Sequence, residues 1–235
     1  MKTEVKIYSG SKCPDSIFGQ IQYNNVWGWK AIDDNRKNLL QKEAGDIEKI
    51  FKKLDNGKDE YIGKPCILLI LESPHINEYK DPNNPCAANG TTGKNIGKYL
   101  CNIFNNIGVN KKICKNNSST LIKFLNKNQL HIINILVVNS VQYQCSLGIE
   151  PICHIIKEEN WMDEWFSNRN DFISRLGKIY SKNSCFIINL CTSGVFVPMK
   201  TIVKDNLHTK LNVQNNYCEG PHPSSWSRLK KIEFK

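Results

Sequence analysis

Short apolar runs are spaced along the second part of the chain, and each has the length of a strand. Cys66–Leu71, Ile132–Val138 and Cys185–Leu190 are almost continuously apolar. Runs of this kind are typical of parallel strands that are buried on both faces. A weaker fourth strand is expected at Asn215–Cys218, before a turn that is rich in glycine and proline.

The segments between these runs carry apolar residues at helical spacing. We expect helices over Lys94–Ile107, Ser118–Lys127, Trp161–Tyr180 and Pro198–Leu207, and a short basic helix over Ser225–Phe234. Strands that alternate with helices favour an open parallel sheet that is covered on both faces. The pattern therefore predicts an α/β fold: a three-layer α/β/α domain around a central, mainly parallel four-stranded sheet.

The chain before the first apolar run has a different pattern. Residues 1–63 are expected to form an N-terminal extension packed on the core, or an edge layer of it, with one amphipathic helix over Lys37–Leu54 that ends at Asp55-Asn56-Gly57. Residues 64–235 are expected to form the catalytic domain.

The charge balance of the 235-residue chain indicates the kind of partner. It has 32 Lys and Arg residues against 22 Asp and Glu residues, a net charge of +10. Such a balance favours a polyanionic partner such as nucleic acid. The alternative is codon bias, because Lys, Asn and Ile are all favoured by AT-rich genes.

Targeting and cofactor signals are weak. The longest apolar runs are far shorter than the roughly 20 residues of a membrane helix, and Met1–Gly10 does not resemble a signal peptide. We therefore expect a cytoplasmic protein with no membrane partner. The 10 cysteines include no Cys-x-x-Cys pair, so we expect reduced thiols, no metal site and no cofactor.

Polar residues follow the expected strands. Glu72 comes after the first strand, Asn139 after the second and His222 after the last. Active sites of open parallel sheets lie beyond the carboxyl ends of the strands, so these three side chains should converge. Each also has an ordinary interpretation: a salt-bridged acid, an amide in a turn, and a histidine in a rigid proline-flanked turn.

A glycine-containing loop precedes the first core helix. Its sequence runs from Gly90 to Asn95 as Gly-Thr-Thr-Gly-Lys-Asn. A nucleoside-triphosphate loop requires Gly-x4-Gly-Lys-Ser/Thr, and Ala88 and Asn95 occupy two of its fixed positions. Nucleotide hydrolysis is therefore disfavoured, although the loop can still bind a phosphate or a base edge at a helix N-terminus.

Taken in order, these motifs resemble those of the uracil-DNA glycosylase superfamily over about residues 65–228. The matching residues are Glu72-Ser73-Pro74 after the first strand, the segment Gly90–Ile96, Asn139, and His222-Pro223-Ser224 after the last strand. Two positions depart from the family pattern. Leu71 replaces the glycine that usually opens the first motif, and His75 stands where uracil-specific members often carry a tyrosine that blocks the methyl group of thymine.

The resemblance implies a monofunctional DNA glycosylase that hydrolyses the N-glycosidic bond of a flipped, modified pyrimidine and leaves an abasic site. The expected partner is duplex DNA that carries the modified base, with no obligate protein partner. One branch of the superfamily removes glucosylated hydroxymethylcytosine from phage DNA in antiviral defence. The alternative substrate is uracil or another deaminated base in repair.

The resemblance also implies residue roles. Glu72 stabilises the sugar cation and orients water, His222 donates a hydrogen bond to the pyrimidine O2, and Asn139 recognises the base edge. Substrate contacts are expected from Ser73, Pro74, His75, Gly90, Thr91, Thr92 and Asn95. DNA contacts are expected from Ser224, Ser225, Trp226, Arg228 and Lys230. Trp226 stands where family members place an apolar wedge, and its alternative is a place in the core.

Two other classes remain open on the residues alone. In a metal-dependent nuclease, Glu72 would be a metal ligand together with a second acid such as Glu78 or Asp81. In a non-catalytic module, the same scaffold would bind DNA without producing abasic sites.

Overall fold

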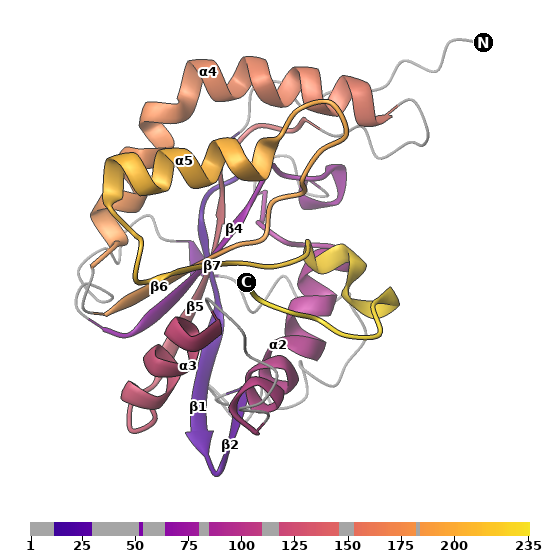
Figure 1. Ribbon diagram of the computed structural model, residues 1–235. Helices are drawn as coiled ribbons and strands as arrows, with labels where there is room; N and C mark the ends of the chain where they lie inside the picture. The colour runs from indigo at the N-terminus through magenta and orange to yellow at the C-terminus, as the bar shows by residue number, and fades with distance from the viewer. Residues whose placement is uncertain are drawn as a thin grey trace.

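The computed structural model describes residues 12–29, 52–53, 64–79, 85–109, 118–145, 153–181 and 184–235. Within them the chain forms one mixed sheet of seven strands, in the order β2-β1-β5-β4-β6-β7 with β3 paired to β1 (Figure 1). The parallel strands are β4 (Cys66–Leu71), β5 (Ile133–Asn139), β6 (Cys185–Asn189) and β7 (Tyr217–Glu219). These are the four strands that the apolar runs predict.

The α/β class is confirmed, but the prediction of a four-stranded sheet is wrong. Three further strands, β1 (Ser16–Asn24), β2 (Val26–Trp29) and β3 (Lys52–Lys53), extend the sheet beyond β5 with antiparallel pairing. They come from the segment assigned to an N-terminal extension. β1 mixes polar and apolar residues around Gly19 and contains a register shift there, which weakens its strand pattern.

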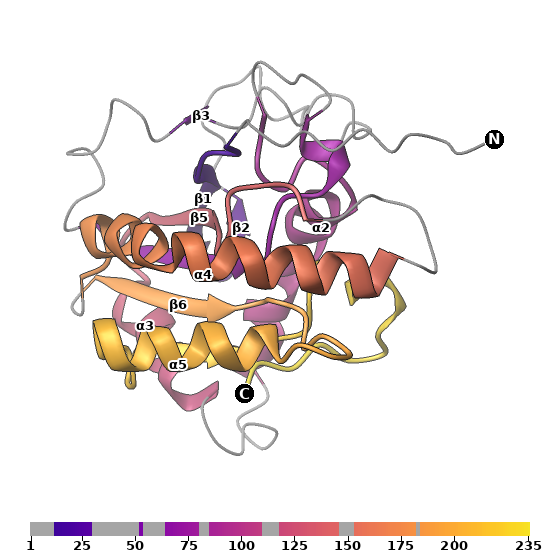
Figure 2. The same ribbon diagram turned by 90° about the horizontal axis from the view of Figure 1, so that it is seen from above.

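Helices cover the two faces of the sheet (Figure 1). α2 (Thr91–Val109) and α3 (Ser118–Lys127) pack on one face, and α4 (Cys153–Ile179) and α5 (Met199–Leu211) pack on the other. Figure 2 shows α4 and α5 side by side over β6. None of the helices in the described ranges combines the length and apolar character needed to cross a bilayer.

Strand β4 explains why an uninterrupted apolar run suits this architecture. Ile67, Leu69 and Leu71 belong to the core under α2 and α3. Leu68 and Ile70 belong to the core under α4 and α5. Successive side chains of a strand point to opposite faces, so a strand with helices on both sides must be apolar at every position.

The predicted helices differ from the observed ones mainly at their ends. The bounds of α3 are confirmed, and α2 and α5 are longer than expected. α4 begins at Cys153 rather than at Trp161. The apolar pattern misses this part of the helix because polar residues such as Lys157 and Glu158 lie there, and they contact the site described below. The helix expected over Lys37–Leu54 lies outside the described residues, except for Lys52–Lys53, which form β3.

The prediction of a basic helix over Ser225–Phe234 is wrong. A 3₁₀ turn, η4 (Pro223–Arg228), ends at Arg228, and the chain then runs back to the sheet. Lys235 and Glu219 exchange two backbone hydrogen bonds, of 2.7 and 2.8 Å. The Phe234 ring is buried against Gly220, where an added Cβ would lie 2.5 Å from the ring. Burial of this aromatic side chain outweighs the local helical pattern.

The turn into α2 requires glycine at one position. Ala88 adopts φ +59°, and its carbonyl oxygen would lie 2.0 Å from a Cβ added at Gly93. We expect Gly93→Ala to lower the free energy of unfolding in urea by about 1 to 3 kcal/mol, because the backbone must move to relieve the overlap.

Gly97→Ala, one turn further along α2, is the matched control. An added Cβ there meets only the Phe18 ring, at 4.0 Å, so this variant should be as stable as the wild type or up to about 1 kcal/mol more stable. Equal destabilisation by the two substitutions would contradict the account of the turn.

Candidate active site

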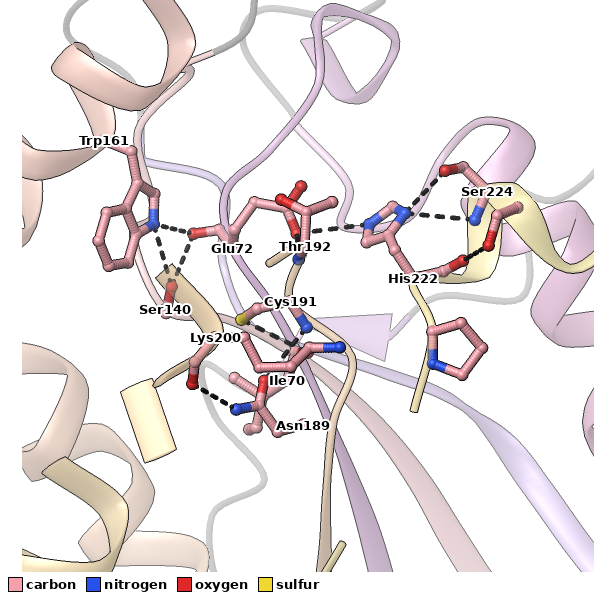
Figure 3. A network of polar contacts seen from close by, with 12 residues as sticks. Ile70, Glu72, Ser140, Trp161, Asn189, Cys191, Thr192, Lys200, His222 and Ser224 are labelled. Atoms are coloured by element: carbon pink, nitrogen blue, oxygen red, sulfur yellow. Dashed lines mark hydrogen bonds and ion pairs between the residues drawn. The ribbon is translucent and has the colours of Figure 1, made fainter. Parts of the chain in front are cut away.

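Glu72 lies just beyond the carboxyl end of β4, and its carboxylate contacts three other parts of the fold, of which Figure 3 labels Thr192 and His222. The side chain is buried. Oε1 lies 2.5 Å from Lys157 Nζ of α4, and Oε2 accepts a hydrogen bond of 3.2 Å from the Thr192 backbone N–H after β6. His222 Nε2, at the start of η4, lies 3.5 Å from Oε2. Elements far apart in sequence therefore converge on one carboxylate.

The charge state of Glu72 follows from these neighbours. Burial by itself would raise the pKa, but electrostatic interaction with the His222 imidazole and the Lys157 ammonium, with hydrogen bonds to the carboxylate, lowers the pKa of Glu72 to about 2. The side chain is thus an anion at neutral pH. A buried, ionised carboxylate is arranged to stabilise positive charge that develops next to it.

The backbone of Glu72 is fixed as firmly as its side chain. Its carbonyl oxygen accepts hydrogen bonds from Ser140 Oγ at 2.7 Å, from Trp161 Nε1 at 2.9 Å and from the Val141 N–H at 3.1 Å. Figure 3 shows the first two of these contacts. The end of β5 and the buried face of α4 thereby set the direction of the Glu72 side chain.

His222 is held by its own turn. Nδ1 accepts a hydrogen bond from the Ser224 N–H at 3.3 Å and lies 2.8 Å from Ser224 Oγ. This acceptor role assigns the proton of the neutral ring to Nε2, on the side of Glu72. Burial lowers the pKa of His222, more than the nearby Glu72 carboxylate raises it. The ring is therefore a neutral hydrogen-bond donor at pH 7.

Asn139 lies at the carboxyl end of β5 with its side chain fully buried. Neither Nδ2 nor Oδ1 of its amide makes a hydrogen bond of good geometry among the described residues; its one polar contact is a weak one with the carboxyl of Glu78, whose pKa it lowers. Its backbone carbonyl accepts a bond of 3.0 Å from Arg175, which is ion-paired with Asp15. Leaving a buried amide unsatisfied costs roughly 1 to 3 kcal/mol, so a ligand that pairs with it recovers that cost.

Glu78 is a second buried carboxyl, which lies near Asn139. Burial raises the pKa of Glu78 to about 8, although hydrogen bonds from the Ala88 and His75 backbone, the Cys13 thiol and the Asn139 amide act to lower it. Glu78 is therefore mainly protonated at neutral pH, unlike Glu72. Of the two carboxyls, Glu72 is ionised and Glu78 is mainly protonated, because only Glu72 faces the Lys157 ammonium and the His222 imidazole.

The residues predicted around the first motif have mixed positions. Ser73 and Pro74 follow Glu72 directly, and the buried Ser73 Oγ makes no hydrogen bond within the described residues. His75 is half-buried, and its Nδ1 accepts a bond of 3.2 Å from the Asn77 N–H. Burial and the charge of Lys157 lower the pKa of His75.

The glycine-containing loop forms the start of α2. Gly90 accepts a hydrogen bond of 3.0 Å from the Lys94 N–H, and Thr91 and Thr92 begin the helix. No hydrogen bond between described residues links either threonine to the Glu72 carboxylate. Asn95 has a structural contact: its Nδ2 donates to the Pro223 carbonyl at 2.7 Å. It thereby holds the turn that carries His222.

The residues predicted to bind DNA divide into two groups. Ser224 and Ser225 bond within the turn, Ser225 Oγ donating to the His222 carbonyl at 2.7 Å, whereas Arg228 and Lys230 are exposed. Trp226 is 1% exposed, donates from Nε1 to the Pro221 carbonyl at 2.9 Å and contacts Phe234. The structure therefore places Trp226 in the core, which is the alternative to a wedge.

Several site residues have no signal in the sequence. Lys157 precedes the recognisable apolar face of α4, and Thr192 contributes only its backbone N–H. Lys200, in the first turn of α5, donates from Nζ to the Gly220 carbonyl at 2.6 Å, and burial lowers its pKa. In the sequence, this end of the sheet is indicated by the polar residues that follow the strands, Glu72, Asn139 and His222.

Neither a search for metal-ligand clusters nor comparison with known proteins assigns a role to these residues. Within the described ranges, no three His, Cys, Asp or Glu side chains gather in a way that could hold a metal ion. Comparisons of the chain with protein-family models, with curated proteins and with solved structures found no match.

The raised pKa of Glu78 predicts how the stability of the protein changes with pH. The native protein ionises Glu78 near pH 8, whereas an unfolded glutamate ionises near pH 4.5. The stabilisation is therefore present below about pH 4.5 and is lost as the pH rises towards 8. Glu78→Gln cannot ionise, so its free energy of unfolding relative to the wild type should rise between pH 5 and pH 8, by at most about 1.4 kcal/mol per pH unit.

Urea denaturation at several pH values measures this difference. Glu159→Gln makes the same chemical change at an exposed position of α4 and should follow the wild type at every pH. A constant offset between Glu78→Gln and the wild type would show that Glu78 is already ionised in the native state at pH 5.

Proposed function

We propose that this protein is a monofunctional DNA glycosylase that hydrolyses the N-glycosidic bond of a flipped, modified pyrimidine and leaves an abasic site. The observation that carries the proposal is the pairing of a buried, ionised Glu72 with a neutral His222 at 3.5 Å. The proposed substrate is glucosylated hydroxymethylcytosine in phage DNA, and the role is antiviral defence. Uracil or another deaminated base in repair is the alternative.

The reaction separates charge, and the two side chains suit its two ends. As the bond from C1′ to the base nitrogen breaks, positive charge develops on the sugar and negative charge on the base. Glu72 stabilises the sugar cation and orients the water that attacks C1′. With a pKa of about 2, Glu72 is a weak base, so its contribution is mainly electrostatic, and the water proton passes to solvent.

The leaving base is stabilised at its oxygen. The Nε2–H of neutral His222 donates a hydrogen bond to the pyrimidine O2, where negative charge grows. The ring needs no proton from solvent for this role, because burial keeps it neutral and the Ser224 N–H, which donates to Nδ1, leaves the ring proton on Nε2. One such donor is typically worth roughly 10²- to 10³-fold in rate.

The unsatisfied amide of Asn139 supports recognition of a base. It offers one acceptor and two donors, which match the hydrogen-bonding edge of a pyrimidine. Enzymes of this kind recognise an extruded base by its edge and by stacking. The net charge of +10 and the exposed Arg228 and Lys230 suit attraction of the phosphate backbone.

The departures at Leu71 and His75 support a substrate other than uracil. In the superfamily that the chain resembles, a tyrosine at the position of His75 excludes a methyl group at C5. His75 is half-buried and has no tyrosine hydroxyl or phenol ring. The substitution removes the tyrosine that excludes C5 substituents in uracil-specific members, which supports a base that carries a large group at C5, such as glucosylated hydroxymethylcytosine.

A metal-dependent nuclease is less well supported. The ammonium group of Lys157 lies 2.5 Å from Glu72 Oε1, where it would repel a divalent cation. Glu78 is mainly protonated at neutral pH, which makes it a poor metal ligand. Asp81 lies outside the described residues.

The test is base release from duplex oligonucleotides that carry glucosylated hydroxymethylcytosine, hydroxymethylcytosine, uracil or cytosine. Alkali cleaves the chain at each abasic site, and the fragments are resolved by size. The wild type should fragment the glucosylated duplex, with or without EDTA. Glu72→Gln and Asn139→Ala should fold and bind DNA but lose roughly 10²- to 10⁴-fold in rate.

Asp163→Asn and Asn170→Ala make matched changes at exposed positions of α4 and should retain wild-type rates. Fragmentation of the uracil duplex alone would select the repair alternative. Loss of all cleavage in EDTA, or strand breaks before alkali, would select the nuclease. Binding without abasic sites on any of the four DNAs would leave a non-catalytic module.

A further inference from the structure

The loop between β6 and α5 presents two neighbouring apolar side chains to solvent. Val195 is 72% exposed and Phe196 is 67% exposed. We infer that these two residues form the wedge that enters duplex DNA and fills the space left by the flipped nucleotide. The inference rests on the proposed glycosylase function and adds the element that would open the duplex.

A protein that flips a base needs a group to replace it. Extrusion costs a few kcal/mol of stacking and pairing, and apolar side chains that insert between base steps offset this cost in other DNA-binding proteins. In the turn after His222, Trp226 is 1% exposed and its indole N–H donates a hydrogen bond to the Pro221 carbonyl. Leu229, which ends that turn, is a single side chain 41% exposed, whereas Val195 and Phe196 are an adjacent and more exposed pair.

The loop is next to the reacting carboxylate. Thr192, which begins it, donates its backbone N–H to Glu72 Oε2 at 3.2 Å, as Figure 3 shows. Phe196 is four residues further on, so its Cα lies within roughly 14 Å of Thr192 Cα by chain length alone. In Figure 1 this loop and η4 lie on the same side of the molecule, at the end of α5 where that helix begins.

The conformation of the loop tip is fixed by hydrogen bonds to Glu158. The buried carboxylate of Glu158 accepts hydrogen bonds from three consecutive backbone N–H groups, those of Val195 at 2.7 Å, Phe196 at 2.7 Å and Val197 at 2.6 Å. Gly194 adopts φ +74°, and an added Cβ there would lie 1.9 Å from the Val197 carbonyl oxygen. A buried carboxylate needs hydrogen-bond donors, and the three backbone N–H groups of this loop supply them to Glu158.

This anchoring matters for insertion. The backbone bonds fix the loop while leaving the Val195 and Phe196 side chains outside. A group that is ordered before binding loses less conformational entropy when it binds. Single exposed hydrophobic residues are normal on protein surfaces. This loop differs from such single residues because it presents an adjacent pair, is held by Glu158 and is connected through Thr192 to Glu72.

The first test uses the DNA of the panel above from which the wild type releases a base. It compares base release from the duplex and single-stranded forms of that DNA. Phe196→Ala and the double variant Val195→Ala/Phe196→Ala should lose at least about tenfold on the duplex and stay within about twofold on the single strand, which needs no wedge. Phe166→Ala removes another exposed phenylalanine, 61% exposed on α4, and should match the wild type on both forms. Equal losses on the two forms would overturn the wedge.

The second test does not depend on catalysis. A duplex with a tetrahydrofuran abasic site beside 2-aminopurine reports unstacking by fluorescence. The wild type and Glu72→Gln should increase the fluorescence and bind this duplex at least about tenfold more tightly than an intact one, and the double variant should do neither. A double variant that behaves like the wild type overturns the wedge, while base release by the wild type in the panel still supports the proposed function. If the wild type releases no base in the panel, the proposed function fails and the wedge fails with it.

Discussion

The buried carboxylate of Glu72 is the constraint on which the site depends. A carboxylate removed from water is costly unless cations and hydrogen-bond donors surround it. Lys157, His222 and the Thr192 backbone supply them from three separate elements, and Ser140 and Trp161 hold the Glu72 carbonyl. Because a buried ion pair is weak evidence for stability, an arrangement that draws on so many elements points to use of the charge itself.

Two neighbouring residues near the start of α4, Lys157 and Glu158, contact two different parts of the site. Lys157 neutralises Glu72, while the adjacent Glu158 binds the backbone of the loop between β6 and α5. The helix therefore links the position of the Glu72 carboxylate to the shape of the loop beside it. The same region shows how environment sets protonation: Glu72 has a pKa of about 2 beside cations, and Glu78 a pKa of about 8 without them.

Much of the architecture could be predicted from the sequence. The three apolar runs have the length and composition that are typical of strands with cover on both faces, and parallel strands bring their carboxyl ends to one edge. That reasoning led to Glu72 and His222, which lie 3.5 Å apart. It missed β1, whose mixed pattern surrounds Gly19, and it extended a helix through Phe234, whose burial against Gly220 belongs to long-range packing.

The sequence by itself determined the α/β class, the four parallel strands and the edge at which polar residues gather, because hydrophobic period and strand direction are local or topological properties. The tertiary structure decided which residues complete the site. Lys157, the backbone of Thr192 and the support of Glu158 carry no motif, and Trp226 belongs to the core although its position in the sequence suggests a wedge. Charge state and exposure depend on neighbours that only folding brings together.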